Sequence, residues 1–251
     1  MDDRTTKLDR LNIFIRCFFV QASWNFKSLL GLGFCFCVIP IARRFYKTRE
    51  EKSEFLKRHL EFFNAHPYFA SWCVGAVTRL EEEAVQKDWP DESPISIFKS
   101  RLTGPLGAIG DQIFWTRVKP AASALGLCLA LLVGWIAIPI YLVVYNIPHL
   151  FVRIHGMKLG YHKGFDLVSN VSIRRFQKIA DRISKAGLVL AGVLISIAAG
   201  WSLKHDVSSL IAFLVAVAIS FLLLNMKKSN TFIIFTVYFI SILLGLLFFL
   251  L

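Results

Sequence analysis

A 32-residue stretch without Asp, Glu, Lys or Arg, Ala121–Val152, most constrains what this chain can fold into. It is longer than the roughly 20 residues that one straight transmembrane helix needs, and it contains Pro139 and Pro148. Every backbone polar group in a bilayer core must bond within the protein, so only helices and closed barrels span membranes. We therefore expect either one long broken helix or one crossing followed by a re-entrant piece.

Three further apolar segments point to a membrane protein with several crossings. They are Ala186–Leu203, Ser208–Met226 and Thr231–Leu251. Hydrophobic residues make up 55% of the chain, above the roughly 45–50% apolar content of soluble domains. The fold class that follows is all-α, a polytopic helical integral membrane protein with re-entrant or broken helices.

The net charge of +12 fits the same interpretation. Lys and Arg gather in the connecting segments, as the positive-inside rule expects for cytoplasmic loops, and no aromatic-basic nucleic-acid motif is visible. The first residues lack a signal-peptide pattern, so we expect a cytoplasmic N-terminus. The basic run before Ala186 then sends the next crossing outward, and after two more crossings the C-terminus is external.

Residues 1–119 differ from residues 120–251, and we treat the two parts as separate domains. Leu29–Ile41 is too short to cross a bilayer and is predicted to form a re-entrant or interfacial hairpin. Thr48–Phe63 has the pattern of a helix whose Leu56, Leu60 and Phe63 share a face. Glu54 precedes Arg58 by four residues, which favours an ion pair between them.

A basic amphipathic helix is predicted for residues 172–185. Ile173, Phe176, Ala180 and Ile183 line one face of it. The remaining surface is cationic and includes Arg174, Arg175, Lys178 and Arg182. A helix of this kind lies in the membrane interface, so we expect these cations to contact the cytoplasmic leaflet or a partner protein.

Gly104–Pro120, with the sequence GPLGAIGDQIFWTRVKP, holds the strongest candidate for a functional residue. Asp111 lies in this glycine-rich apolar segment, and a carboxylate at membrane depth is costly unless a cavity or partner covers it. The glycines favour a bent, re-entrant backbone. Asp111 therefore either binds a polar solute, with Gln112 in support, or forms an ion pair with Arg117 or Lys119 or caps a helix.

Two other candidates are polar groups near helix ends. Asn64-Ala65-His66-Pro67 joins two predicted helices, and it is either a plain turn with Asn64 as a cap or a junction that presents an amide and an imidazole to a solute. Glu82 lies in a run of three carboxylates, two of which are expected to face water while one pairs with Arg79 or faces a transport cavity. The candidate solute-binding residues are Asp111, Asn64, Glu82, His66 and Gln112.

No motif for catalysis or for a metal is recognisable. His149, His155 and His162 match no zinc spacing, and the chain has neither a P-loop nor a G-x-S-x-G elbow. The five cysteines are expected to be buried thiols. We therefore expect no catalytic residue, no metal and no cofactor.

Several stretches resemble the IID component of the mannose/fructose/sorbose branch of the bacterial phosphoenolpyruvate-dependent sugar phosphotransferase system. They follow one another in the family's order from about Gln21 to Gly192. The stretches are QASWNF (Gln21–Phe26), GLGFCF (Gly31–Phe36), IPIARRFY (Ile39–Tyr46), RHLEFFNAHPY (Arg58–Tyr68), GPLGAIGDQIFW (Gly104–Trp115), KPAASALG (Lys119–Gly126) and YHKGFD (Tyr161–Asp166).

The resemblance implies a multi-pass subunit of the bacterial inner membrane that pairs with a IIC subunit to translocate a neutral hexose-type sugar. A soluble IIB subunit, phosphorylated by IIA, would phosphorylate the incoming sugar, and the IID subunit would carry no phosphoryl group. The chain departs from the family pattern in its short KHDV connector and in Gln112. An alternative is therefore a non-transporting scaffold or regulatory paralogue that binds a IIC-like partner.

Overall fold

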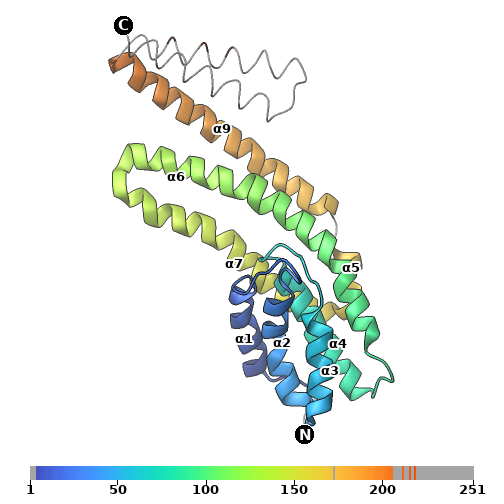
Figure 1. Ribbon diagram of the computed structural model, residues 1–251. Helices are drawn as coiled ribbons and strands as arrows, with labels where there is room; N and C mark the ends of the chain where they lie inside the picture. The colour runs from blue at the N-terminus through green and yellow to red at the C-terminus, as the bar shows by residue number, and fades with distance from the viewer. Residues whose placement is uncertain (1–3, 172, 206–210, 212–214, 216–217, 219–251) are drawn as a thin grey trace. The chain divides into compact units, whose positions relative to one another are not determined.

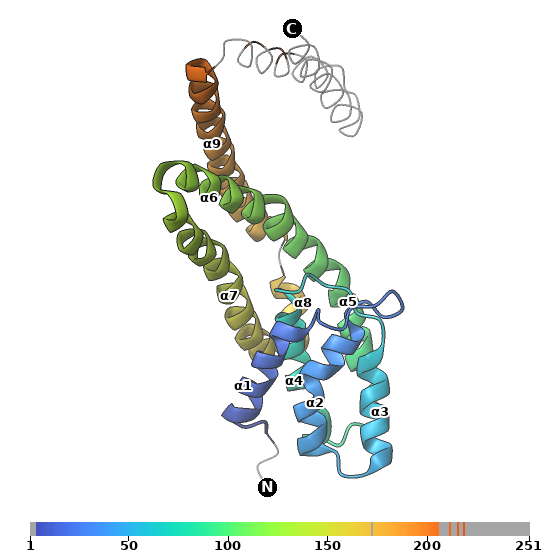
Figure 2. The same ribbon diagram turned by 60° about the vertical axis from the view of Figure 1, so that its left-hand side comes forward.

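The computed structural model describes residues 4–171 and 173–205 and the single positions 211, 215 and 218. Within this part of the chain all the regular elements are helical, which confirms the all-α prediction (Figures 1 and 2). In chain order the elements are α1 (Lys7–Arg16), η1 (Cys17–Phe19), α2 (Gly31–Phe45), α3 (Arg49–Leu60), α4 (Ala70–Gln86), α5 (Ser93–Gly110), η2 (Asp111–Val118), α6 (Lys119–Val133), η3 (Gly134–Ile136), α7 (Ala137–Lys163), η4 (Gly164–Asp166), α8 (Leu167–Asn170) and α9 (Ile173–His205).

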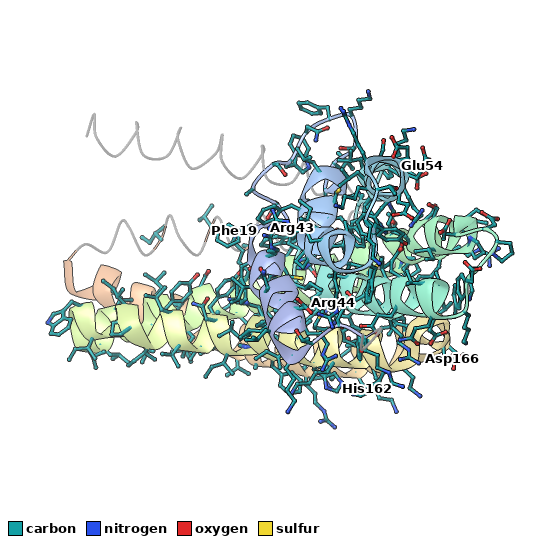
Figure 3. The ribbon with its side chains drawn as sticks, turned by 90° about the horizontal axis from the view of Figure 1, so that it is seen from below. Phe19, Arg43, Arg44, Glu54, His162 and Asp166 are labelled. Atoms are coloured by element: carbon teal, nitrogen blue, oxygen red, sulfur yellow. The ribbon has the colours of Figure 1, made fainter. Side chains whose placement is uncertain are left out.

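Helices α1 to α4 form a bundle in which α2 is largely buried. Leu29–Ile41 was predicted to be a hairpin, but this segment is instead a loop end followed by a helix that continues through Pro40 to Phe45. Arg44 on α2 pairs with Asp9 on α1 at 3.1 Å, and Figure 3 shows Arg44 beside α1. The short apolar segment is therefore a core helix of the bundle.

Helix α3 begins where its sequence predicts and ends earlier. The side-chain oxygen of Thr48 accepts a hydrogen bond from the Glu51 amide, and Glu51 accepts one from the Thr48 amide, which is a capping box. The helix ends at Leu60, so the predicted face through Phe63 is wrong, and its buried residues are Phe55 and His59. The predicted ion pair is also wrong, because Glu54 pairs with Lys57.

The most extensive helix–helix packing joins α4 and α7 and depends on glycine. A Cβ atom added to Gly75 would lie 2.3 Å from the Met157 carbonyl oxygen, and one added to Gly160 would lie 2.1 Å from the Trp72 carbonyl oxygen. Small residues let two helix backbones approach closely in membrane proteins. The Trp72 indole also donates to the Val152 carbonyl at 3.1 Å.

The glycine-rich segment around Asp111 is helical, so the prediction of a bent, re-entrant backbone is wrong there. Helix α5 continues into the π-helical turns of η2 and then into α6. A π-helix widens the turn and commonly marks a functional position within a helix. The division between residues 1–119 and 120–251 that composition suggested therefore lies inside this continuous helical run.

Helices α6 and α7 form a hairpin, an arrangement that differs from both alternatives considered for Ala121–Val152 (Figure 1). Gly134 ends α6 with φ of 64°, a left-handed conformation that favours glycine. Within the described residues one helical run, Ser93–Ser169, is long and apolar enough to cross a membrane, with a mean hydropathy of 2.6 in its best window. Only 11% of that window is buried by the protein, so its side chains are available to lipid.

Helix α9 corrects the prediction of a separate interfacial helix at residues 172–185. It runs from Ile173 to His205 without a break and so joins the basic segment to the next apolar one. Phe176 packs at 5.6 Å from Phe69 and 5.9 Å from Trp72, measured between ring centroids. The apolar face of the basic segment thus contacts α4 and its N-cap residue rather than lying free for lipid.

The chain divides into two compact units, residues 1–188 and 189–251. The first contains α1 to α8 and the first half of α9. The apolar segments Ser208–Met226 and Thr231–Leu251 lie outside the described residues, apart from the single positions 211, 215 and 218.

Candidate functional site

Two loops meet beside α5 and form one wall of a polar cavity. The Leu30 amide donates to the Phe63 carbonyl at 2.9 Å, and the Phe63 amide donates to the Ser28 carbonyl at 3.2 Å. These bonds tie the loop between α1 and α2 to the loop between α3 and α4. Figures 1 and 2 show the two loops side by side next to α5. The paired loops hold Asn64-Ala65-His66-Pro67 in place.

The cavity has a volume of about 160 Å³. Residues from three separate stretches line it, namely Gln21, Trp24, Leu30, Asn64, Ala65, His66, Pro67, Gly107, Asp111 and Trp115. Three of the five predicted solute-binding residues, Asp111, Asn64 and His66, therefore lie together. Gln21 and Trp24 were not predicted as site residues, although they belong to the QASWNF stretch that resembles the family.

His66 lines this cavity and has one hydrogen-bonding atom that is unused. The side chain is 1% exposed, and its Nδ1 accepts a hydrogen bond from the Tyr68 amide at 3.2 Å. The neutral imidazole therefore carries its proton on Nε2, and that atom has no partner among the described residues. Burial, with a smaller effect from the nearby charge of Arg153, lowers the pKa of His66 to about 4, so His66 is a neutral donor at physiological pH.

The backbone of α5 and the rings of η2 fix the position of His66. A Cβ atom on Gly110 would lie 2.1 Å from the Cβ of His66, so only glycine allows this approach. The imidazole stacks on Phe114 with ring centroids 5.3 Å apart, and the Trp115 ring lies 5.0 Å away. The end of α5 thus supplies a gap, and the π-helical turn an aromatic surface, for one imidazole.

Asp111 lies at the start of the π-helical turn with an exposed side chain. Of the structural alternatives considered for it, the ion pair with Arg117 or Lys119 is absent within the described residues, whereas Asp111 is the C-cap residue of α5 through its backbone amide. Arg117 donates to the Gln112 carbonyl and to Thr116, and Lys119 lies over the Trp115 ring at 5.2 Å. Asp111 therefore has no ion-pair partner in the part of the chain that the structure describes.

Glu82 and Gln112 are not part of this cavity. Glu82 is fully buried and accepts hydrogen bonds from the Thr5 amide at 2.7 Å, from the Thr5 hydroxyl and from the Tyr161 hydroxyl at 2.7 Å. It ties the segment before α1 to α7. Gln112 is half-buried, and its backbone carbonyl accepts hydrogen bonds from the side chains of Thr116 and Arg117.

A buried network around Glu81 was missed by the sequence analysis. Glu81 accepts two bonds from Arg58, each 3.0 Å long, one of 2.9 Å from His59 and one of 2.8 Å from Tyr46. Burial opposes the ionisation of Glu81, but the hydrogen bonds and charges of His59 and Arg58 outweigh it and lower its pKa to about 2. The network fixes α3 against α4, and none of its residues lines the polar cavity.

The basic segment of α9 exposes Lys178 and Arg182. The side chains of Arg174 and Arg175 lie outside the described residues. No group of three or more His, Cys, Asp or Glu side chains that could hold a metal ion occurs in the described part of the chain.

Comparisons with known proteins agree with the resemblance in the motifs. A model of the PTS system mannose/fructose/sorbose family IID component matches residues 4–250. The PTS system mannose-specific EIID component of Escherichia coli (strain K12) is 34% identical over 196 residues, 78% of this chain and 69% of that protein. The fructose permease IID component of Bacillus subtilis (strain 168) is 35% identical over 196 residues, 78% of this chain and 71% of that protein.

Solved structures share the fold. A chain in the cryo-EM structure of the mannose transporter ManYZ in complex with microcin E492 is 35% identical, with a TM-score of 0.62 over 76% of this chain and 70% of that one. A structure described as a membrane protein is 30% identical, with a TM-score of 0.74 over 94% of this chain and 95% of that one. The chain therefore belongs to the mannose/fructose/sorbose family of IID membrane components of the phosphotransferase system.

Proposed function

We propose that this IID subunit forms a sugar-translocating unit with a IIC subunit and that its polar cavity contributes to the sugar path. The observation that carries the proposal is the meeting of three stretches, around Gln21, Asn64 and Asp111, at one cavity. All three belong to stretches that resemble the family, and they are distant in sequence.

The cavity lining has the chemistry that a neutral sugar requires. Hydroxyl groups both donate and accept hydrogen bonds, and amides and carboxylates can exchange these bonds with them as water leaves. His66 Nε2 supplies a donor, Asp111 an acceptor, and Asn64 and Gln21 both kinds of group. Trp24 and Trp115 give the cavity aromatic walls, against which the apolar face of a sugar ring can pack.

The size of the cavity supports a shared site. Its volume of about 160 Å³ lies below the roughly 300–1,000 Å³ of pockets that enclose drug-sized ligands. A IIC subunit covering this face would complete the enclosure. In this arrangement IIB, supplied by IIA, phosphorylates the sugar, and the IID subunit contributes no catalytic residue.

The basic segment of α9 is a candidate surface for IIB. Lys178 and Arg182 are exposed there. Reversing Arg174, Arg175 and Lys178 to Glu should weaken IIB binding in a salt-dependent way, because interactions between exposed charges are screened by salt. Unchanged IIB binding together with poorer membrane insertion would show that the segment is only an anchor.

We also propose a multi-pass topology with a cytoplasmic N-terminus and an external C-terminus. It rests on the positive-inside rule and the short connectors KHDV and KKSN. A reporter fused after Leu251 tests it. A signal of the cytoplasmic type would contradict the topology and would mean that one apolar segment does not cross.

The experiment that tests the proposed function is sugar uptake in a bacterial host that lacks its own mannose-family permease. The chain is co-expressed with IIA, IIB and IIC subunits of its system, and uptake of labelled hexoses is compared with a host that lacks this chain alone. Uptake that requires this chain supports the proposal. Assembly with IIC in the absence of any uptake would favour the scaffold alternative.

A further inference from the structure

A second cavity, lined by other residues than the polar one, lies between α1 and α7. Its volume is about 300 Å³. Its apolar walls are Leu11, Phe14, Ile154 and Met157, and its polar residues are Arg10, Lys158, Tyr161 and His162. It shares no lining residue with the polar cavity, so its ligand need not be the sugar. We call it the α1–α7 groove.

The surroundings of the α1–α7 groove are unusually apolar for a water-facing surface. Leu8 is 77% exposed, Ile15 is 51% exposed and Phe151 is 67% exposed. Large exposed apolar side chains grouped around one groove mark a contact with a protein or a membrane. Since this chain is a membrane protein, acyl chains are available at such a surface.

The charges at the groove have one sign. None of the residues that line it is acidic. Glu82, which is close to Tyr161, is buried and already accepts hydrogen bonds from Thr5 and Tyr161. Arg10 lies over the Tyr161 ring at 4.9 Å and donates from one terminal nitrogen to the Thr5 carbonyl, which leaves its other nitrogen atoms available to an anion.

Lys158 and His162 complete the cationic and hydrogen-bonding rim. Both are exposed, and Figure 3 shows His162 pointing outward from α7. Within the described residues Lys158 forms no ion pair. The two residues are four apart and therefore lie on the same face of the helix, so both can reach one ligand headgroup.

The groove also lies where α7 changes from apolar to basic. Residues 137–152 carry no charged side chain, whereas residues 153–163 include Arg153, Lys158 and Lys163. Such a change marks the level of the membrane interface, where cationic side chains meet lipid headgroups. A phospholipid beside α7 would likewise have its acyl chain on the apolar side of this change and its phosphate on the basic side.

From these observations we infer that the α1–α7 groove binds one phospholipid with an anionic headgroup. An acyl chain lies between Phe14 and Ile154, and the headgroup phosphate accepts hydrogen bonds from Arg10, Lys158 and His162. The lipid would fasten α1 to α7 at the membrane interface.

Native mass spectrometry of the full chain, purified from membranes with any subunit that remains bound, tests the inference. Phosphatidylglycerol and phosphatidylcholine are titrated separately. We expect one phosphatidylglycerol to bind before any phosphatidylcholine does. Lys158→Gln should weaken that first binding about fivefold, the effect of removing one basic residue near a lipid surface. Lys163→Gln, with the same charge change outside the groove, should leave it unchanged.

A second variant distinguishes the binding of a lipid from the binding of a free phosphate. Ile154→Asn places a polar group in the apolar wall at an exposed position, and it should weaken phosphatidylglycerol binding without removing a charge. Glycerol phosphate should not compete with the lipid. Equal binding of both lipids, equal effects of Lys158→Gln and Lys163→Gln, or competition by glycerol phosphate would each overturn the inference.

Discussion

Glu81 and Asp111 are both carboxylates of a membrane protein, but their surroundings are opposite. Glu81 is fully buried and accepts hydrogen bonds from Arg58, His59 and Tyr46. Asp111 lines a polar cavity, and no ion-pair partner for it occurs among the described residues. A buried carboxylate whose hydrogen bonds are all made by the protein stabilises the fold, whereas one left without protein partners is available to a ligand.

The largest expected effect is on stability, from Glu81→Gln. Removing the charge of Glu81 leaves Arg58 with only the longer, 3.9 Å contact to the partly exposed Glu92, and loss of one partner of a buried ion pair typically costs about 3–5 kcal/mol. The change in thermal stability of the detergent-solubilised protein measures it. Glu54→Gln is the matched control, because the ion pair of Glu54 with Lys57 is exposed and should contribute only about 0–1 kcal/mol. Equal effects of the two variants would contradict the structural role of Glu81.

Acid should weaken the same network. The pKa of Glu81 is lowered to about 2 in the folded protein, so its stabilising contribution is complete above its unfolded pKa of about 4.3 and is lost as pH falls towards 2. Burial also lowers the pKa of His59. A further loss of stability therefore begins as pH falls below the unfolded pKa of this residue, about 6.5. Melting temperatures from pH 7 to pH 3 should therefore fall steadily, and Glu81→Gln should remove the steepest, most acidic part of that fall.

Glu82→Gln should have a smaller structural effect. Glu82 was a candidate for sugar binding, yet its hydrogen bonds go to Thr5 and Tyr161. Gln can keep some of these bonds, so we expect a loss of about 1–3 kcal/mol and faster proteolysis of the N-terminal segment. Glu83→Gln serves as the control on the same helix. A large loss of sugar affinity with unchanged stability would place Glu82 in the sugar path after all.

Gly110→Ala tests the position of His66. The added Cβ would lie 2.1 Å from the Cβ of His66, so the imidazole must move, at a cost of about 1–3 kcal/mol for overpacking. Sugar uptake should fall while membrane insertion persists. Gly104→Ala is the control on the same helix, because nothing lies within 4 Å of its added Cβ. Normal uptake by Gly110→Ala would exclude His66 from the sugar path.

The same contrast explains how much of the molecule the sequence could predict. The Asn64–Pro67 junction and Asp111 were identified because proline and an isolated carboxylate are visible without a structure. Glu81, Glu82 and Glu83 could not be told apart, since consecutive helical residues point about 100° from one another. In the structure Glu81 accepts a hydrogen bond from His59 on α3, Glu82 accepts hydrogen bonds from Thr5 and Tyr161, and Glu83 accepts one from Arg79.

Other elements differed from prediction because tertiary packing decided them. Glycines near Asp111 indicated an irregular backbone, but Gly110 is needed inside a helix to admit His66. The Gly156–Gly160 pair was not recognised as a packing motif, because its partner Trp72 lies on a helix distant in sequence. Gln21 and Trp24 reach the cavity on a loop that is bonded to the loop between α3 and α4, a pairing that the sequence does not reveal.

The smallest expected change in stability and the most direct test of the account is Asp111→Asn. The variant keeps the shape of the side chain and removes its charge, so assembly and melting temperature should stay within about 0.5 kcal/mol of the parent. Loss of one charge-assisted hydrogen bond should cost about 1.5–3 kcal/mol of sugar binding, a roughly ten- to hundredfold weaker apparent affinity in uptake. Normal assembly with that loss of affinity is the result we predict. Failed assembly, or intact uptake with intact assembly, would contradict the role of Asp111 in the sugar path.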